Sequence, residues 1–511
     1  MNLLFTTQGA SLNMFEALGN HLSDKIELGR TGYTISNSWY YTEWIKNHPA
    51  FEGAGHLLLK EWEITNKRSG MANPALLARY EKELGLEDLF GAIVADRRLL
   101  LGPHCTYRQD YRRRFDDREL YRILEESVLA MEKLFDELQP DYVIGYVCTT
   151  ALEYLASLFA KARNIPYLNL RPSRIGGNYA YYSSTIKEPG PELVVAFNKN
   201  MSSLPSKITQ AKEVIESARQ RSFSRYEGQP VPSAKTAQRL NFKRNILGPT
   251  FRLWKAHLKY KNSVAASDNH VPGILTPTLF NGILNPIRAR YQDRILRPLY
   301  TTSEQLQKIR YAFFPLHTEP EVSLLINCRP LMNQIEIIRM IATSLPVDMN
   351  LAVKEHPWMV GKRSISAYRK LLNIPRVKIV PPEMEVPALV AQADLITLPA
   401  GTVALDSMFH KKPVLTLGHT STNLLPDTMV RRCEDLTRMP EIIRELLDTH
   451  EHNERALEAY IATILERSDT MNLYTGLLER KGYTEEEIPF EKDVATLGEL
   501  TLRALKELSI A

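Results

Sequence analysis

Short runs of apolar residues, each followed by a turn and an amphipathic stretch, recur in two blocks of the chain. In the first block, NLLF (2–5), YVIGYV (142–147) and IPYLNL (165–170) predict buried strands. The stretch 117–137 repeats its apolar residues about every 3.6 positions and predicts an amphipathic helix. Strand, helix and parallel strand make a βαβ unit, so this block predicts a doubly wound α/β lobe.

The second block begins near Tyr311 and shows the same rhythm. The segments YAFFPL (311–316), NLAVKEHP (350–357), DLITLPAG (394–401) and PVLTLG (413–418) predict strands, with helical patterns between them. Ligands of such folds bind at the carboxyl ends of the strands. The fold class that we predict is therefore α/β, with two Rossmann-like lobes.

The chain between the two blocks lacks the alternation of strands and helices. It holds helical stretches and proline-rich turns, and it predicts a helical, basic insert or linker. We predict four units: an N-terminal Rossmann-like lobe (1–184), the insert (185–305), a C-terminal lobe (306–475) and a helical tail (476–511).

Composition narrows the choice of function classes. The chain has 511 residues, of which 44% are hydrophobic and 24% charged, as in ordinary globular proteins. Its four cysteines are widely spaced and form no CxxC pair, so we expect neither a zinc module nor a disulfide scaffold, and no metal site. The sequence has no GxGxxG after a strand and no GxxxxGK[ST], which disfavours a dehydrogenase and a P-loop NTPase.

Positive charge is concentrated in one segment. Eight basic residues and no acidic residue lie between Lys235 and Lys261, and the stretch 235–300 carries a charge of +10 in a chain whose net charge is +5. Aromatic residues such as Trp254 lie among these cations. Such a pattern over 235–262 is typical of a basic amphipathic helix on an anionic membrane surface. The alternative is a solvated helix packed on its own domain; we expect no nucleic-acid partner, because no recognised module is present.

The segment VKEHPWMVGKRS (353–364) is the first candidate site. A predicted strand delivers Lys354 and His356 into a loop that Pro357 stiffens, and Arg363 follows. Cations and an imidazole at the end of a strand suit a phosphate group. The alternative is a solvated surface pair with a histidine that caps a turn.

Two further strand ends carry polar residues. In LPAGTVALDSMF, a predicted strand ends before Gly401, where Thr402 occupies the N-cap position of a helix and Asp406 lies one turn later. Free N–H groups there suit an anion, and Asp406 suits a ribose hydroxyl; the alternative is an ordinary capped helix. In FFPLHTEPE (313–321), Glu319 follows the strand and is expected to face the other lobe, unless it is a solvated acidic loop.

The segments FFPLHTEPE, NQIEIIRMIATSLP, LAVKEHP and LPAGTVALDSMFHKKPVLTLG together resemble the capsular polysaccharide biosynthesis glycosyltransferases, which include capsule Kdo transferases. The resemblance covers the C-terminal lobe well and the N-terminal lobe only in its βαβ layout. It implies a GT-B-like fold and a nucleotide-sugar donor as substrate, with CMP-Kdo among the donors. It implies no bound cofactor.

The resemblance also implies roles for the residues of the C-terminal lobe. His356 and Pro357 would hold the nucleotide, and Lys354 would support a phosphate. Gly401 and Thr402 would form the second phosphate contact. Two acidic residues would complete the donor site: Asp406, where related folds more often have Glu, and Glu319.

The N-terminal lobe is expected to hold the acceptor and the catalytic base. Glu153, just after the strand 142–147, and Asp96 are the candidate catalytic carboxylates. Complementation of a helix dipole is the alternative role of Glu153. Arg171 and Arg174 follow the next strand and suit an anionic sugar or a phosphate.

These observations predict a glycosyltransferase that moves a sugar from a nucleotide donor to a capsular polysaccharide or its lipid-linked precursor, a glycan or glycolipid acceptor. We expect a cytoplasmic protein, peripheral on the inner face of the plasma membrane. Two alternatives remain open. One is a nucleotide-sugar epimerase of the same shape, which needs no acceptor, and the other is a non-catalytic peripheral scaffold of polysaccharide assembly.

Overall fold

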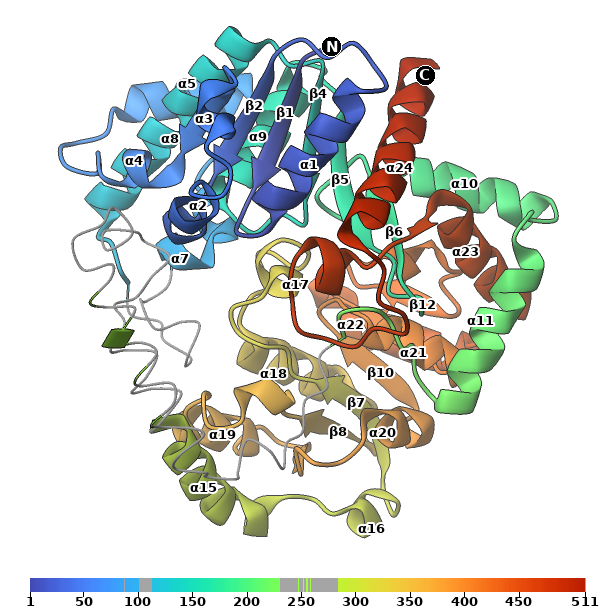
Figure 1. Ribbon diagram of the computed structural model, residues 1–511. Coiled ribbons are helices and arrows are strands. Elements are labelled where there is room, and N and C mark those ends of the chain that lie inside the picture. Colours follow the sequence, from blue (N-terminus) through green and yellow to red (C-terminus); the bar gives the residue numbers. More distant parts are fainter. Residues whose placement is uncertain are drawn as a thin grey trace.

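The computed structural model describes residues 1–86, 88–100, 113–229 and 284–510, and five single residues between 247 and 258. Two α/β lobes, each built around its own sheet, lie one above the other in Figure 1. The predicted fold class, two Rossmann-like lobes, is confirmed. The predicted basic helix at 235–262 lies, apart from those single residues, outside the described residues, and the predicted unit boundaries stay a prediction.

The N-terminal lobe is organised by one mixed sheet. Its strands are β1 (Leu3–Thr7), β2 (Thr31–Ile35), β3 (Leu57–Lys60), β4 (Tyr142–Tyr146), β5 (Tyr167–Pro172), β6 (Tyr179–Ser183) and β13 (Asp469–Thr470). They lie in the order β13-β6-β5-β4-β1-β2-β3; the strands from β5 to β3 pair in parallel, and β6 and β13 pair antiparallel. The three strands predicted in this lobe correspond to β1, β4 and β5.

Nine helices of the described part of the chain surround this sheet. They are α1 (Ser11–Ser23), α2 (Ser38–Trp44), α3 (Ala50–Gly53), α4 (Glu61–Thr65), α5 (Pro74–Glu83), α6 (Gly91–Ala95), α7 (Arg97–Leu100), α8 (Asp117–Leu138) and α9 (Ala151–Ala162). The predicted helix 117–137 is α8, which begins with a capping box between Asp116 and Glu119 and buries its apolar face beside α9.

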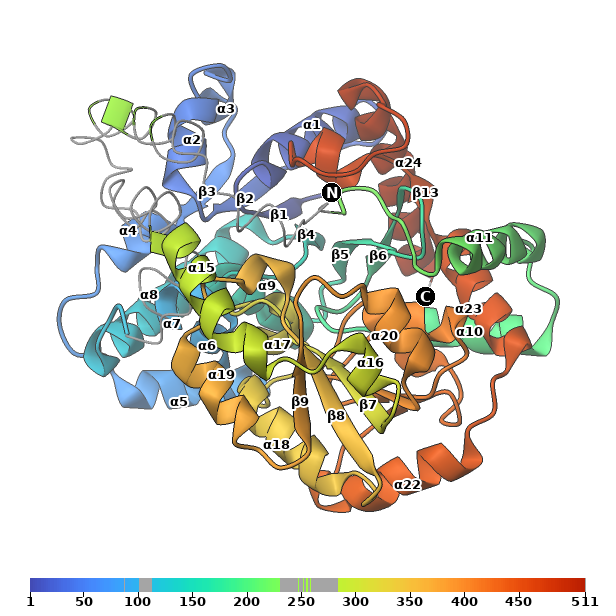
Figure 2. The same ribbon diagram turned by 90° about the horizontal axis from the view of Figure 1, so that it is seen from below.

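The C-terminal lobe contains a fully parallel sheet. Its strands are β7 (Arg310–Pro315), β8 (Met349–Lys354), β9 (Val377–Val380), β10 (Leu395–Leu398), β11 (Val414–Thr416) and β12 (Val430–Arg432). They lie in the order β12-β11-β10-β7-β8-β9, so the carboxyl ends of all six point to the same edge (Figure 2). The four strands predicted in this block correspond to β7, β8, β10 and β11.

Helices of the C-terminal lobe cover both faces of the sheet and precede its first strand. They are α15 (Asn285–Leu296), α16 (Ser303–Leu306), α17 (Val322–Leu325), α18 (Gln334–Ser344), α19 (Ile365–Leu372), α20 (Val386–Gln392), α21 (Val403–Phe409) and α22 (Met439–Thr449), with the short 3₁₀ turns η4 (Arg297–Leu299), η5 (Pro357–Met359), η6 (Ser421–Leu424) and η7 (Leu436–Arg438).

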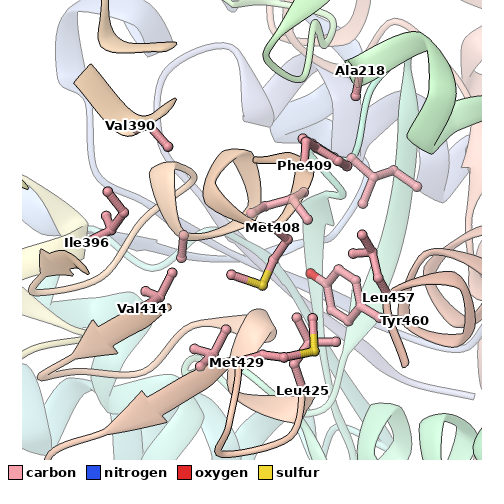
Figure 3. Packing of buried hydrophobic residues seen from close by; sticks show 14 of the residues in the cluster. Ala218, Val390, Ile396, Met408, Phe409, Val414, Leu425, Met429, Leu457 and Tyr460 are labelled. Atoms are coloured by element: carbon pink, nitrogen blue, oxygen red, sulfur yellow. The ribbon is translucent and has the colours of Figure 1, made fainter. Parts of the chain in front are cut away.

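Helices on one flank join the two lobes. They are α10 (Pro191–Ser202), α11 (Ile208–Arg221) and α23 (Glu454–Arg467). Both α10 and α11 pack on α23, and Figure 3 shows Ala218 of α11 near Phe409 of α21 and Leu457 of α23 in one apolar cluster. Because this cluster contains side chains of both lobes, burial of apolar surface holds the lobes together there.

The chain returns to the N-terminal lobe at its end. After α23, β13 adds to the first sheet, η8 (Leu473–Leu477) follows, and α24 (Phe490–Ile510) packs beside α1 (Figure 1). The lobes also touch directly where Arg329 donates to the carbonyl of Gly91 at 2.6 Å and to the hydroxyl of Tyr154 at 2.9 Å. No helix within the described residues is long and apolar enough to cross a membrane.

Candidate functional site

Three loops at the carboxyl edge of the C-terminal sheet touch one another. They follow β7, β8 and β10, which are neighbours in the sheet. The ring Nε2 of His317, after β7, lies 2.5 Å from the carbonyl oxygen of Ala400, after β10. Arg363, in the loop after β8, donates to the carbonyl of His317 at 3.1 Å. The parallel order of the strands thus brings together the three segments that the sequence singled out.

Arg363 is the buried centre of these loops. Its guanidinium donates to Glu355 at 2.7 Å and to Glu319 at 2.9 Å, and its side chain is 1% exposed. Tyr368 donates to the same Glu355 carboxylate at 2.7 Å. The sequence groups Arg363 with cations for a phosphate, but these contacts show a structural counter-ion instead. Glu319, a predicted donor-site residue, likewise accepts hydrogen bonds from Arg363 and Gln334.

Lys354 and His356 lie beside this cluster. Lys354 ends β8 and is 4% exposed, and within the described residues its ammonium makes one hydrogen bond, to the Glu355 carbonyl at 3.4 Å. Burial lowers the pKa of Lys354, against the opposing charges of Glu355, Glu385 and Glu383. An ammonium buried with so few partners is costly, and it suits an anionic ligand.

His356 caps the short turn η5, in which Pro357 is the first residue. Its Nδ1 accepts a hydrogen bond from the backbone N–H of Trp358 at 3.2 Å. Burial lowers the pKa of His356, although Glu321 and Glu355 oppose this effect. The imidazole is therefore neutral at neutral pH, with Nε2 as its remaining polar atom, and the half-exposed Trp358 ring lies beside it.

The loop after β10 is shaped by one glycine. Gly401 has φ +124°, and a Cβ there would lie 3.1 Å from Nε2 of His317, so a side chain would be strained and crowded. Thr402 precedes α21 without a side-chain capping bond. Asp406 accepts a hydrogen bond from the N–H of Ser224 at 2.9 Å, and burial raises its pKa to about 7.

The two candidate carboxylates of the N-terminal lobe are both fully buried beside the start of α9. Asp96 accepts from Arg98 at 3.0 and 2.9 Å and from the N–H of Ala151 at 3.2 Å. Burial alone would raise the pKa of Asp96, but Arg98 holds it below its usual range. This carboxylate is a counter-ion that fixes α7 to α9.

Glu153 is the N3 residue of a capping box with Thr150. Its Oε2 accepts from the backbone N–H groups of Thr149 and Thr150 at 2.8 and 3.0 Å, while its Oε1 is buried without a hydrogen-bond partner. Burial raises the pKa of Glu153 to about 7, against those N–H groups and Arg98. Oε2 therefore has the alternative role, that of a carboxylate oxygen at a helix N-terminus. Oε1 has no hydrogen-bond partner in the part of the chain that the structure describes and is not used in that role.

Arg171 and Arg174 lie in different surroundings. Arg171 belongs to β5, and its side chain reaches the loop after β6. There its guanidinium donates to the carbonyls of Thr185 and Ile186 and lies 3.4 Å from the carboxylate of Glu188. Its guanidinium thus organises that loop. Arg174 has φ +57° and is held instead among aromatic rings between the lobes.

Those rings come from two distant segments. Arg174 donates to the hydroxyl of Tyr474 at 3.4 Å and lies over the ring of Tyr226 at 5.8 Å. Tyr226 hydrogen-bonds Thr402, and burial together with the charge of Asp406 raises the pKa of Tyr226. This tyrosine therefore connects Arg174 with the loop after β10. Burial would raise the pKa of Tyr474, but Arg174 lowers it below its ordinary value.

Sequence reasoning missed Tyr226 and Tyr474. Neither follows a predicted strand, and they are far from Arg174 and Thr402 along the chain. The available signal was local: Tyr226 follows Arg225 in a short polar stretch between helices. No group of His, Cys, Asp and Glu within the described residues is arranged to hold a metal ion.

Part of the chain matches the model of a known family. Residues 199–425 match the family model described as capsule polysaccharide biosynthesis protein, which includes the loops after β7, β8 and β10. No curated protein sequence matches the chain.

Several solved structures are similar to the chain at low identity. KpsC of Thermosulfurimonas dismutans, a beta Kdo 2,4 transferase, is 14% identical over 66% of this chain and 83% of that chain, with a TM-score of 0.35. UDP-GlcNAc 2-epimerase from Neisseria meningitidis is 10% identical over 99% of this chain and 100% of that chain, with a TM-score of 0.27. The predicted resemblance to the capsule polysaccharide biosynthesis family is confirmed through the match over residues 199–425.

Proposed function

We propose that the protein is a glycosyltransferase of capsule polysaccharide synthesis, which moves a sugar from a nucleotide donor to a growing glycan or its lipid-linked precursor. The family match supports the process. The site supports the chemistry, because neighbouring strand ends of one Rossmann-like lobe carry the candidate nucleotide contacts, and Arg97 of the other lobe donates to the carbonyl of Pro320 in the loop after β7. CMP-Kdo is one donor within this proposal.

The observation that carries the donor site is the buried ammonium of Lys354. One weak hydrogen bond does not offset the cost of burying a cation, and a phosphate oxygen would supply the missing partner. His356 would contact the nucleotide through Nε2, and Pro357 fixes the backbone on which it lies. Gly401 and Thr402 would form the second phosphate contact, and Asp406 the ribose contact.

Glu153 is the carboxylate that we assign as general base. A base works best when its pKa lies near the working pH, and burial raises the pKa of Glu153 to about 7. Oε1 is the atom that would take the acceptor proton, since Oε2 is held by backbone N–H groups. The pKa of Asp96 is lowered instead of raised, and the two hydrogen bonds that Asp96 accepts from Arg98 favour a positioning role.

Calorimetric titration with CMP, UDP, GDP and ADP tests the donor site. We expect one nucleotide to bind the wild type and to bind Lys354→Met or His356→Ala at least about tenfold more weakly, which corresponds to about 1.4 kcal/mol. The matched control is Lys370→Met, an exposed lysine on α19, which should bind like the wild type. Equal binding by Lys354→Met, or no nucleotide binding at all, contradicts the assignment.

Product analysis then separates transfer from epimerisation. The donor that contains the preferred nucleotide is incubated with the protein, with and without an acceptor glycan, and its sugar is followed by NMR. A transferase leaves the sugar configuration of the donor unchanged until an acceptor is added. Conversion of the donor alone to an epimer would replace the proposed function by that of an epimerase.

We also propose that the segment 235–262 docks the enzyme on an anionic membrane. Phe251, Trp254 and Leu258 expose their apolar side chains and are spaced as one helical face, and the surrounding sequence is basic. Sedimentation with vesicles of phosphatidylglycerol and phosphatidylcholine should recover the wild type, and Trp254→Asp should reduce the recovery. Leu204→Asp, at an exposed apolar residue elsewhere, is the control; binding that neither variant changes contradicts this docking.

A further inference from the structure

Four basic side chains lie at the junction between the N-terminal lobe and the strands β11 and β12. Their charges act on one another, and His419 and Arg432 are in direct contact. Lys187 lies in the loop after β6, and Arg329 follows α17. His419 follows β11, and Arg432 is the last residue of β12. None of the four was singled out by its sequence context, because they come from four separate segments.

The positions of these side chains are fixed by contacts around them. Nη1 of Arg432 lies 2.8 Å from Nε2 of His419. The backbone N–H of His419 donates to the carbonyl of Asn327 at 2.8 Å, which ties the loop after β11 to the loop that carries Arg329. That loop is in turn anchored on the N-terminal lobe through Arg329. The cluster is therefore part of the junction between the lobes.

Over the ranges that the structure describes, the positive charges of the cluster are not balanced by a buried negative charge. Burial lowers the pKa of Lys187, and the charges of Arg329 and Arg432 lower it further. Burial also lowers the pKa of His419 to about 4, with Arg432 and Lys187 acting in the same direction and Glu434 against them. Glu434, which pairs with Arg432, has a side chain that is 71% exposed, so solvent screens its charge.

The ammonium of Lys187 has no hydrogen bond or ion pair within the described part of the chain, although the side chain is half-buried. Glu188, the neighbouring acid, is engaged by Arg171 and Tyr181 instead. Like charges held together without a buried counter-ion raise the free energy of the folded state. An anion that entered the cluster would remove this cost, and the partly exposed side chains leave it accessible.

We propose that Lys187, Arg329, His419 and Arg432 form a binding site for a carboxylate or phosphate group on the acceptor glycan. This inference rests on the proposed function for the identity of the ligand. The site adjoins the loop after β10, because β11 pairs with β10, and it is farther from the loop after β8. Three strand spacings separate β8 from β11, or roughly 14 Å at about 4.8 Å each. Lys187 also belongs to the N-terminal lobe, where the acceptor is expected.

Binding of acidic and neutral trisaccharides at fixed ionic strength tests this site. We expect trigalacturonate to bind the wild type at least about tenfold more tightly than its neutral methyl ester, because each carboxylate meets charged donors. Lys187→Met and Arg432→Met should lose most of this preference. The control Lys308→Met removes an exposed lysine beside the amino end of β7, at the opposite edge of the sheet, and should keep it. Equal binding of acid and ester by the wild type overturns the proposal.

Inorganic phosphate tests which anions the site binds, and nucleotides test whether the site is distinct from the donor site. Competition of phosphate with trigalacturonate would show that the site takes either anion, whereas a lack of competition restricts it to carboxylates. Nucleotide binding should be unchanged in Lys187→Met; if it is lost, the cluster belongs to the donor site and the acceptor assignment is wrong. Trigalacturonate binding without any nucleotide binding would preserve this site and contradict the proposed function.

Thermal unfolding of the same variant adds an independent readout. Without an anion, Lys187→Met should unfold at the same or a higher temperature than the wild type, because a partnerless charge is removed. Trigalacturonate should raise the unfolding temperature of the wild type and of Lys308→Met but not that of Lys187→Met. A large fall in the unfolding temperature of Lys187→Met would indicate a structural role for this lysine.

Discussion

Each lobe buries an arginine among carboxylates beside the carboxyl edge of its sheet, but the two clusters differ in how completely their hydrogen bonds are formed. In the C-terminal lobe, Arg363 bridges Glu355 and Glu319, and Tyr368 adds a third donor. In the N-terminal lobe, Arg98 bonds Asp96 through two nitrogens, and the nearby Glu153 keeps one oxygen without a hydrogen-bond partner.

The cluster around Arg363 therefore has a structural role, whereas the cluster around Arg98 contains a carboxylate that titrates near neutral pH. Where donors match the carboxylates, as around Arg363, the charges fix three loops in place. Where a buried carboxylate receives no hydrogen bond from the arginine and one of its oxygens has no partner among the described residues, as at Glu153, burial raises its pKa to about 7. Raised pKa values of this kind are typical of acid–base groups in active sites. The comparison therefore predicts different consequences of disturbing the two clusters.

The largest effect is expected from Arg363→Met, which leaves Glu355 and Glu319 buried without their counter-ion. We expect a loss of about 3–5 kcal/mol in the free energy of unfolding, measured by urea denaturation. Arg369→Met, at an exposed position on α19, should change it by less than about 0.5 kcal/mol. A similar small effect for both variants would show that the ion pairs of Arg363 do not stabilise the three loops.

Arg98→Met should be the next most damaging change. It removes the counter-ion of Asp96, yet Arg98 keeps some solvent contact, so we expect a loss of about 3 kcal/mol. The pKa of Glu153 should also rise above about 7, because Arg98 lowers it in the wild type. Carbon-13 NMR of the carboxyl groups measures this rise, and an unchanged pKa would break the proposed link between the two residues.

Glu153→Gln should change how stability depends on pH. The folded wild type holds the Glu153 proton up to about pH 7, whereas the unfolded chain releases it near 4.5. Stability therefore falls as the pH rises between these values and stays at the lower level above them. The glutamine variant has no such fall in stability, so its free energy of unfolding should gain about 3 kcal/mol on that of the wild type between pH 4.5 and 8.

Urea denaturation at several pH values measures this gain. Asp406, whose pKa is also raised to about 7, contributes in the same window to both proteins and cancels in the difference. Parallel stability curves for the two proteins would contradict the raised pKa of Glu153. At pH 8 the variant should also retain nucleotide binding and lose turnover, if Glu153 is the base.

The smallest effect is expected at the rim of the Arg363 cluster. Gly401→Ala places a Cβ at φ +124° and 3.1 Å from His317, whose carbonyl is held by Arg363. We expect a loss of about 1 kcal/mol from backbone strain, and weaker nucleotide binding because the loop after β10 must shift. Gly55→Ala also has positive φ but lies in open space, so it should lose stability without any change in nucleotide binding.

Much of the fold was predictable because buried parallel strands leave continuous apolar runs in the sequence. This explains why β1, β4, β5, β7, β8, β10 and β11 were anticipated. The strand β2 begins with the polar pair Thr31 and Gly32, and β13 has only two residues. Such strands are defined by their neighbours in the sheet, which sequence periodicity does not reveal.

The candidate site was predictable to the level of loops but not of contacts. Polar residues after β7, β8 and β10 were expected together because parallel strands share one carboxyl edge. Arg363 was expected to face a phosphate, whereas in the fold it pairs with Glu319, 44 residues away. The roles assigned to Lys354, His356 and Asp406 stay predictions.

The sequence by itself determined the two lobes and the loops that carry polar chemistry, because strand and helix periodicity are local properties of the chain. The tertiary structure decided which charges neutralise one another. It placed Arg363 and Arg98 among carboxylates, and it left the ammonium of Lys187 and one oxygen of Glu153 without hydrogen-bond partners in the described part of the chain. Charge pairing depends on distance and burial, and residues far apart in sequence acquire both only when the chain folds.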